Sequence, residues 1–192
     1  MQNNSEIVRQ INAYAMKDGI VLGLFGILSL YIFKESFSIP FFSTLFFVML
    51  IGSPVLGLTR TLRYRNQVYN SSEGFGFFRG FLHAFFMGFY ASIWVAVGIL
   101  VYLKFFDHGT IFAAYEQQLS SPQMMQVIQD SGLIHQMNEI TGGHGVNGIG
   151  EVMRQIGAET YASISLYMPL IFGPFISAII GLIARTPAYM NR

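Results

Sequence analysis

The chain has 192 residues, of which 53% are hydrophobic and only 11% are charged. Soluble domains carry about 25% charged residues, so we expect much of this surface to face lipid instead of water. The net charge of +1 argues against nucleic acid as a partner, and the absence of cysteine excludes disulfides, thiolate nucleophiles and cysteine-ligated metals.

The first apolar run, residues 19–33, is too short to cross a bilayer alone, because a spanning helix needs about 20 apolar residues. Extended back to residue 13 it is long enough, but it then encloses Lys17 and Asp18. Lys17 can reach the head groups, which leaves Asp18 near the interface. A signal peptide is the alternative; we favour a retained span, because no small-residue cleavage site follows residue 33.

Three further apolar runs predict spans at residues 39–58, 81–106 and 164–184. Prolines inside membrane helices are tolerated and usually mark kinks. The prolines in these runs are Pro54, Pro169 and Pro174. With the span at 13–33, the sequence predicts an all-α, polytopic membrane protein with four transmembrane helices, organised as a single membrane domain over residues 1–192.

The segment between spans three and four, residues 107–163, is too polar to span. Ser121-Pro122 predicts a helix start, and the helix is expected to run to about Asn138. The glycine-rich stretch 141–150 breaks this helix. We interpret it as a flexible linker and not as a phosphate-binding loop, because the lysine that such a loop requires does not follow. Apolar residues at helical spacing over 149–156 predict a last helix that can continue into span four. The segment is either a cap or a plain spacer.

Basic residues divide unevenly between the two sides of this four-span arrangement. Eight lie on one side: Arg9, Lys17, Arg60, Arg63, Arg65, Arg79, Arg185 and Arg192. Three lie on the other: Lys34, Lys104 and Arg154. Since cytoplasmic loops are enriched in Lys and Arg, we expect both termini in the cytoplasm.

No pattern predicts a catalytic residue, a cofactor or a metal. His108, His135 and His144 lie in the polar segment near Glu139, but their spacing matches no standard zinc site, so we interpret them as isolated surface residues. His83 is the ionisable residue of most interest in a span. It lies close to Arg79, and a polar anchor or interhelical hydrogen bond is favoured over a proton relay.

Small residues recur every four places in two spans, at Gly19 and Gly23 and again at Gly80, Ala84 and Gly88. Such stripes let helix backbones approach closely in lipid. We expect them to pack within the bundle, and Gly88→Leu to disrupt that packing; a contact between two copies is the alternative.

The loop after span two and the start of span three carry Arg60, Arg63, Arg65 and Arg79. Basic residues beside a span gain about 1 kcal/mol each near an anionic leaflet. These four residues either contact lipid head groups at the cytoplasmic surface or only set the orientation of the spans.

Several of these motifs are similar to those of a known family. Gly19-Ile-Val-Leu-Gly23, the basic run Arg63-Tyr64-Arg65-Asn66, and the pattern Phe81, Ala84, Phe85, Gly88 resemble small four-span inner-membrane proteins, seen mostly in Bacteroidetes, that form a domain of unknown function. The resemblance implies a location in the bacterial inner membrane and the same architecture, but no activity. The ending Arg185-Thr-Pro-Ala-Tyr departs from the family's usual basic tail.

The leading functional hypothesis is a non-catalytic accessory or interaction protein whose partners are membrane lipids and either itself or another membrane protein. A small oligomeric transporter or channel is the first alternative, and a water-accessible cavity lined by Asp18 or His83 would favour it. A lipid-handling enzyme is the second, and a cleft converging on His135, Glu139 and His144 would favour that.

Overall fold

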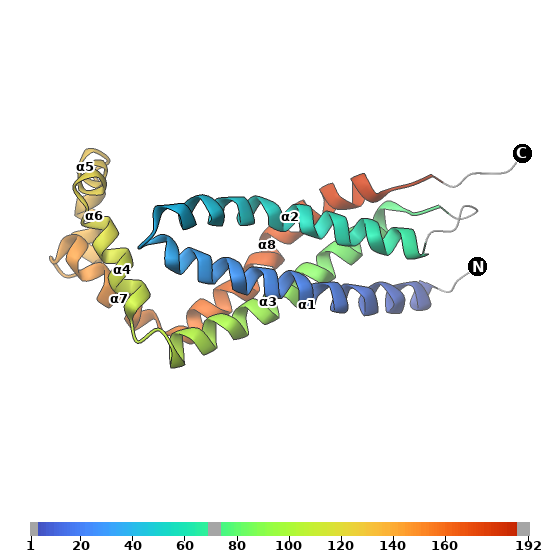
Figure 1. Ribbon diagram of the computed structural model, residues 1–192, viewed down its shortest axis with the longest axis horizontal. Helices are drawn as coiled ribbons and strands as arrows, with labels where there is room; N and C mark the ends of the chain where they lie inside the picture. The colour runs from blue at the N-terminus through green and yellow to red at the C-terminus, as the bar shows by residue number, and fades with distance from the viewer. Residues whose placement is uncertain (1–3, 69–73, 188–192) are drawn as a thin grey trace, which may run out of the picture.

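Four long helices run side by side in the computed structural model, which describes residues 4–68 and 74–187. They are α1 (Asn4–Ser36), α2 (Pro40–Val68), α3 (Phe77–Phe105) and α8 (Ala158–Ala184) (Figure 1). Each is long and apolar enough to cross a membrane. The predicted all-α fold with four spans is therefore confirmed, and the chain is a multi-pass membrane protein.

The helices extend beyond the apolar runs that predicted them. α1 has 33 residues, about 50 Å at 1.5 Å per residue, whereas the hydrocarbon core is about 30 Å thick. Its first turns are polar, and so are the last turns of α2. These turns continue the helical backbone past the hydrocarbon, where water replaces lipid.

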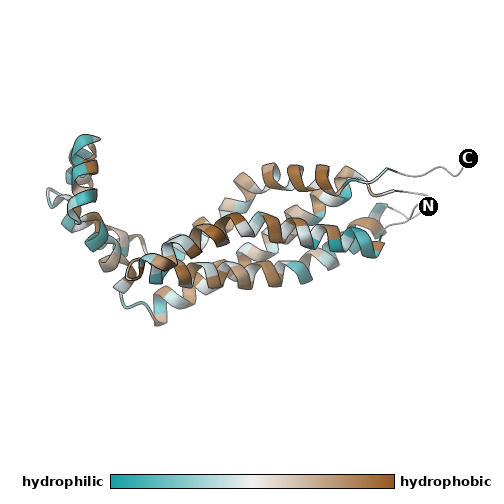
Figure 2. Ribbon diagram, turned by 45° about the horizontal axis from the view of Figure 1, so that its top comes forward, coloured by the Kyte–Doolittle hydropathy of each residue, from teal (hydrophilic) through white to brown (hydrophobic). Residues whose placement is uncertain are grey.

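Brown segments recur along the long helices (Figure 2), and many of their apolar side chains are exposed. Ile51 on α2 and Phe175 on α8 are each 71% exposed. Exposed apolar patches of this extent are rare on soluble monomers. These faces fit a lipid environment.

The long helices are arranged around α3, which packs against both α1 and α8, while α2 packs mainly on α1. α1 begins and α8 ends at the same end of the bundle (Figure 1), here named the terminal end. A small apolar core closes it, made of Ile11, Tyr64, Phe75 and Ala184. Phe75 and Thr186 add an isolated antiparallel bridge with two backbone hydrogen bonds of 2.9 Å.

Short helices form a layer across the opposite end, here named the capped end (Figure 1). They are α4 (Thr110–Leu119), α5 (Pro122–Asp130), α6 (Leu133–Ile140), the 3-10 helix η1 (Gly145–Gly148) and α7 (Ile149–Ile156). Leu119, Ile128 and Val146 form a buried core of their own within this layer. The segment between spans three and four is thus a folded cap.

Four details of the cap differ from the sequence prediction. The helix that begins at Pro122 ends at Asp130, because Gly132 (φ 73°) turns the chain into the left-handed region before α6. α7 does not continue into α8, since Gly157 (φ 81°, ψ 150°) interrupts it. The glycine-rich stretch is an ordered turn with a short 3-10 helix and a buried Val146. The prediction of one helix over 122–138 was wrong, and α4 was not predicted.

Candidate functional site

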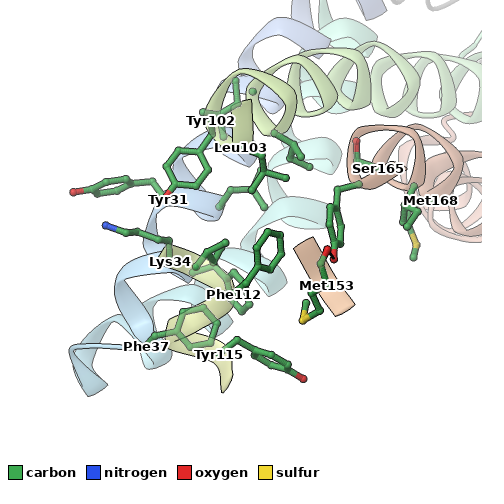
Figure 3. Close-up of a pocket in the computed structure, with 18 residues that line it drawn as sticks. Tyr31, Lys34, Phe37, Tyr102, Leu103, Phe112, Tyr115, Met153, Ser165 and Met168 are labelled. Atoms are coloured by element: carbon green, nitrogen blue, oxygen red, sulfur yellow. Dashed lines mark hydrogen bonds between the residues drawn. The ribbon is translucent and has the colours of Figure 1, made fainter. Parts of the chain in front are cut away.

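A cavity of about 670 Å³ lies inside the capped end. Its walls come from the ends of α1, α3 and α8, and α4 and α7 close it on the cap side. Side chains from these five helices converge on it in Figure 3. The labelled lining residues are Tyr31, Lys34, Phe37, Tyr102, Leu103, Phe112, Tyr115, Met153, Ser165 and Met168.

The cavity follows from how the spans pack. α1 stays close to α3 along its length, because Gly19, Gly23 and Gly26 face α3 and because Gly98 on α3 accommodates Ile27. α8 meets α3 closely near the terminal end. α1 and α8 pack extensively on α3 and not on each other. The space left between them at the capped end is enclosed by the cap.

Four polar groups on the cavity wall have partners within the protein. The Lys34 ammonium lies 2.8 Å from the Glu35 carboxylate, and the Ser165 hydroxyl donates to the Ala162 carbonyl at 2.7 Å. The Tyr161 hydroxyl donates to the Met153 carbonyl at 2.9 Å, and the Tyr102 hydroxyl to the Asp107 carboxylate at 3.1 Å. What remains for a ligand is mainly hydrocarbon and aromatic surface.

The cavity is open at its side. Tyr31 on α1 and Ile164 and Met168 on α8 line it and are 56%, 45% and 49% exposed. In Figure 3, Tyr31 and Lys34 extend to the same side, away from Phe112. The cavity is therefore not closed on the flanks formed by α1 and α8, where an apolar molecule can enter from the bilayer.

Asp107 fixes the cap to the bundle at the α3–α4 junction. Its side chain is only 1% exposed, and Oδ1 accepts hydrogen bonds from the Thr110 hydroxyl and the Ile111 amide, both at 2.9 Å. Further along, the Gly150 amide at the start of α7 donates to Glu116 on α4 at 2.8 Å. These bonds position the two helices that close the cavity.

The histidines of the cap do not contribute to this cavity. His108, His135 and His144, together with Glu139, are exposed and lie outside the cavity wall. Within residues 4–68 and 74–187, no three His, Asp or Glu side chains come together in a way that could hold a metal ion. The hypothesis of a lipid-handling enzyme expects a cleft around His135, Glu139 and His144. The cavity at the capped end is lined by other residues.

The second site is polar and lies near the terminal end, where three spans meet. His83 on α3 is fully buried; its Nδ1 lies 3.0 Å from the Thr61 hydroxyl on α2, and its Nε2 lies 3.4 Å from Asp18 Oδ2 on α1. Asp18 Oδ1 is 3.5 Å from the Arg60 guanidinium. The ring stacks on Tyr64 with centroids 4.5 Å apart. The polar contact expected of His83 thus joins three spans.

The small residues expected to pack helices have unequal surroundings. A Cβ at Gly19 would lie 2.6 Å from the Tyr90 Cβ, and one at Gly23 would lie 2.6 Å from the Trp94 Cβ. A Cβ at Gly80 would lie 3.1 Å from the Gly181 Cα on α8, and Ala84 is buried. A Cβ at Gly88 would meet nothing within 4 Å. In the single chain, the close contact between α3 and its neighbouring helices therefore does not extend to Gly88.

The four arginines expected at the lipid surface also separate. Arg60 turns toward Asp18, and the Arg65 guanidinium lies 3.5 Å from the Ala184 carbonyl. Arg63 is exposed, and Arg79 is close enough to Tyr64 to interact with it electrostatically. Arg60 thus belongs to the polar site among the spans.

The family described as "Protein of unknown function (DUF4199)" matches residues 17–186. The chain belongs to this family. The DUF4199 match runs from α1 to the end of α8, so the resemblance seen in the sequence is confirmed, and both the cavity and the polar site lie within it. No curated protein and no solved structure matches the chain.

The sequence alone missed both groupings. Tyrosines near the capped ends of the spans, at residues 31, 102 and 161, resemble an interfacial aromatic belt, which was the available signal for the cavity. Asp18, Arg60 and His83 lie at similar depths on three spans, and counting residues from a common membrane boundary would have aligned them. Neither signal tells which helices are neighbours.

Proposed function

We propose that this protein is a non-catalytic accessory membrane protein that binds the apolar chain of a membrane lipid in the cavity at its capped end. The observation that carries the proposal is the cavity itself, about 670 Å³ in volume and with exposed lining residues on α1 and α8. Ligand pockets generally measure about 300–1,000 Å³ and are mostly apolar with a few polar groups. A lipid chain fits this volume and chemistry, and the bilayer supplies it at the opening.

The internal pairing of the wall's polar groups supports a ligand that needs no hydrogen bonds there. Lys34, Tyr102, Tyr161 and Ser165 all have partners within the protein. A polar ligand would have to compete with these internal partners for the same donors. The head group is expected to stay at the opening beside Tyr31, outside the cavity.

We further propose an orientation with both termini in the cytoplasm of a bacterial cell and the cavity on the outer side of the inner membrane. The support is the uneven distribution of basic residues, eight against three, of which Arg192 lies outside the described residues. Arg63, exposed at the terminal end, would then meet the anionic head groups of the cytoplasmic leaflet. A second copy of the chain remains a further proposed partner.

The cavity can be tested with a photoreactive phospholipid and full-length protein in lipid nanodiscs. We expect crosslinks on the cavity wall, including α4, in addition to those on the outer surfaces of the spans. Leu103→Trp, which fills the cavity from α3, should abolish most of the wall crosslinks and leave the outer ones unchanged. Val101→Trp, two residues away and 40% exposed, is the matched control and should change neither set.

Two results would count against lipid binding in the cavity. One is wild-type labelling restricted to the outer surfaces of the spans. The other is equal wall labelling in Leu103→Trp and Val101→Trp, provided that both variants unfold at the wild-type temperature.

A further inference from the structure

His83 is completely buried on α3, although α3 is a membrane span and histidine is ionisable. Ionisable groups inside spans are costly and are usually functional. Lipid binding at the capped end makes no use of His83, which lies near the other end of the bundle. The groups around its ring indicate what it does.

Both ring nitrogens face groups that can partner a protonated imidazole. Nε2 is 3.4 Å from Asp18 Oδ2, and a carboxylate can only accept. Nδ1 is 3.0 Å from the Thr61 hydroxyl, which can either donate or accept. Nε2 makes no hydrogen bond in the structure, and the nearby Asp18 carboxylate favours a proton on this nitrogen. Nδ1 can then accept a second proton without losing its partner.

We propose that His83 is a proton-binding site of the bundle. A proton from water at the terminal end forms an N–H bond at Nδ1, and the Thr61 hydroxyl rotates from donor to acceptor. The imidazolium is then held between the Thr61 oxygen and the Asp18 carboxylate. The uptake adds one positive charge. The Thr61 hydroxyl hydrogen changes position, and the Asp18 carboxylate shifts toward Nε2, which makes no hydrogen bond in the structure.

The charges around the ring suit this uptake. Before protonation, the Asp18 carboxylate is balanced by Arg60 at 3.5 Å, a long ion pair. After protonation, Asp18 lies between two cations and is drawn toward the ring. The other titratable groups facing this site are Tyr14 on α1, Tyr64 on α2 and Arg79 on α3. The titratable residues of α8, which are Glu159, Tyr161 and Tyr167, lie toward its other end.

Access to the site is from its edge. The side chains of Asp18 and Arg60 are 14% and 24% exposed, whereas that of His83 is 0% exposed. A proton therefore reaches the ring past Asp18. Because Asp18 is on α1 and His83 on α3, protonation strengthens the attraction between these two helices at the expense of the α1–α2 ion pair.

The test is a pH titration of the histidine ring nitrogens by NMR, with full-length protein in lipid nanodiscs and His83 assigned from the signal lost in His83→Gln. We expect the Nδ1 signal of His83 to report a bound proton at the acid end of a scan from about pH 8 to about pH 5. At one acidic pH where the wild-type ring is partly protonated, Asp18→Asn should lower the protonated fraction, because the imidazolium loses its counter-charge. Arg60→Gln should raise that fraction, because a competing cation is removed.

Exposed His135 provides the control, since His135→Gln should leave the His83 titration unchanged. A wild-type His83 ring that stays neutral down to pH 5 would overturn the proposal, and this measurement decides even where a variant fails to fold. Protonated fractions that change in the same direction in Asp18→Asn and Arg60→Gln would also overturn it, since an interhelical anchor gives no opposed charge effects.

Discussion

Gly23 on α1 and Gly88 on α3 both belong to small-residue stripes, yet their surroundings differ. At Gly23 an added Cβ would lie 2.6 Å from the Trp94 Cβ and 3.1 Å from the Ala91 carbonyl oxygen. The second of these is backbone and cannot turn aside. At Gly88 an added Cβ would meet nothing within 4 Å. The neighbouring helix, and not the spacing of the glycines, decides which position must remain small.

We therefore expect Gly23→Ala to destabilise the protein by about 1–3 kcal/mol, the usual range for overpacking a well-packed contact. Gly88→Ala should be neutral or slightly stabilising, because alanine is the better helix former and finds free space. Thermal unfolding in detergent measures both variants. Equal unfolding temperatures for the two variants would contradict the close contact between α1 and α3.

The comparison of Gly23 with Gly88 also leads to a prediction about contacts between copies of the chain. Since Gly88 has no close neighbour within the chain, Gly88→Leu is no longer expected to disrupt packing within the bundle. If Gly88→Leu stays fully folded but forms a smaller particle than the wild type, its stripe is a contact between copies.

At the scale of single elements, the ends of the short helices depend on glycines with unusual backbone angles. Gly157 has φ 81° and ψ 150°, a region that is essentially restricted to glycine. It separates α7, which closes the cavity, from α8, which forms its wall. A continuous helix through residues 149–184 would carry α7 away from α4 and open the cavity.

Gly157→Ala is expected to cost about 1–3 kcal/mol of backbone strain, released by loosening α7 from the cap. Hydrogen exchange of the α7 amides should become faster, including that of Gly150, whose amide is bonded to Glu116. Gly76→Ala is the matched control, because Gly76 has φ −74° and open space around its Cβ position. Unchanged exchange in α7 of the Gly157→Ala protein would show that another residue sets this junction.

At the scale of the whole molecule, the two sites lie toward opposite ends of the same helices. α1 carries Asp18 in its middle and lines the cavity from Ile27 to Lys34. α3 carries His83 near its start and lines the cavity from Gly98 to Leu103. The two sites therefore share α1 and α3 as common structural elements.

The orientation of the molecule gives a prediction for cysteine labelling, for which the cysteine-free chain is well suited. Gln117 on the cap and Asn66 at the terminal end are both exposed. In intact cells, a membrane-impermeant thiol reagent should modify Gln117→Cys, and Asn66→Cys only after permeabilisation. Labelling of Asn66→Cys in intact cells would reverse the proposed orientation and place the cavity in the cytoplasmic half.

Sequence reasoning succeeded where a local property decides the structure. A run of about 20 apolar residues must become a helix in lipid, because its backbone groups find no other hydrogen-bond partners there; this determined the four spans. Ser121-Pro122 likewise determined where α5 begins. The break at Gly132 was missed, because a glycine in a helical pattern can either continue or end the helix.

The sequence by itself thus determined the class of protein, the number of spans among the described residues and the helical character of the segment between spans three and four. Only the tertiary structure decided that Asp18, Arg60 and His83 meet, and that α1 and α8 leave a cavity against α3. Apolar spans carry little information about their neighbours, because in lipid every apolar face is equally well solvated. Which faces pack is decided by close steric fit, such as Gly19 against Tyr90, and that fit exists only when two helices meet.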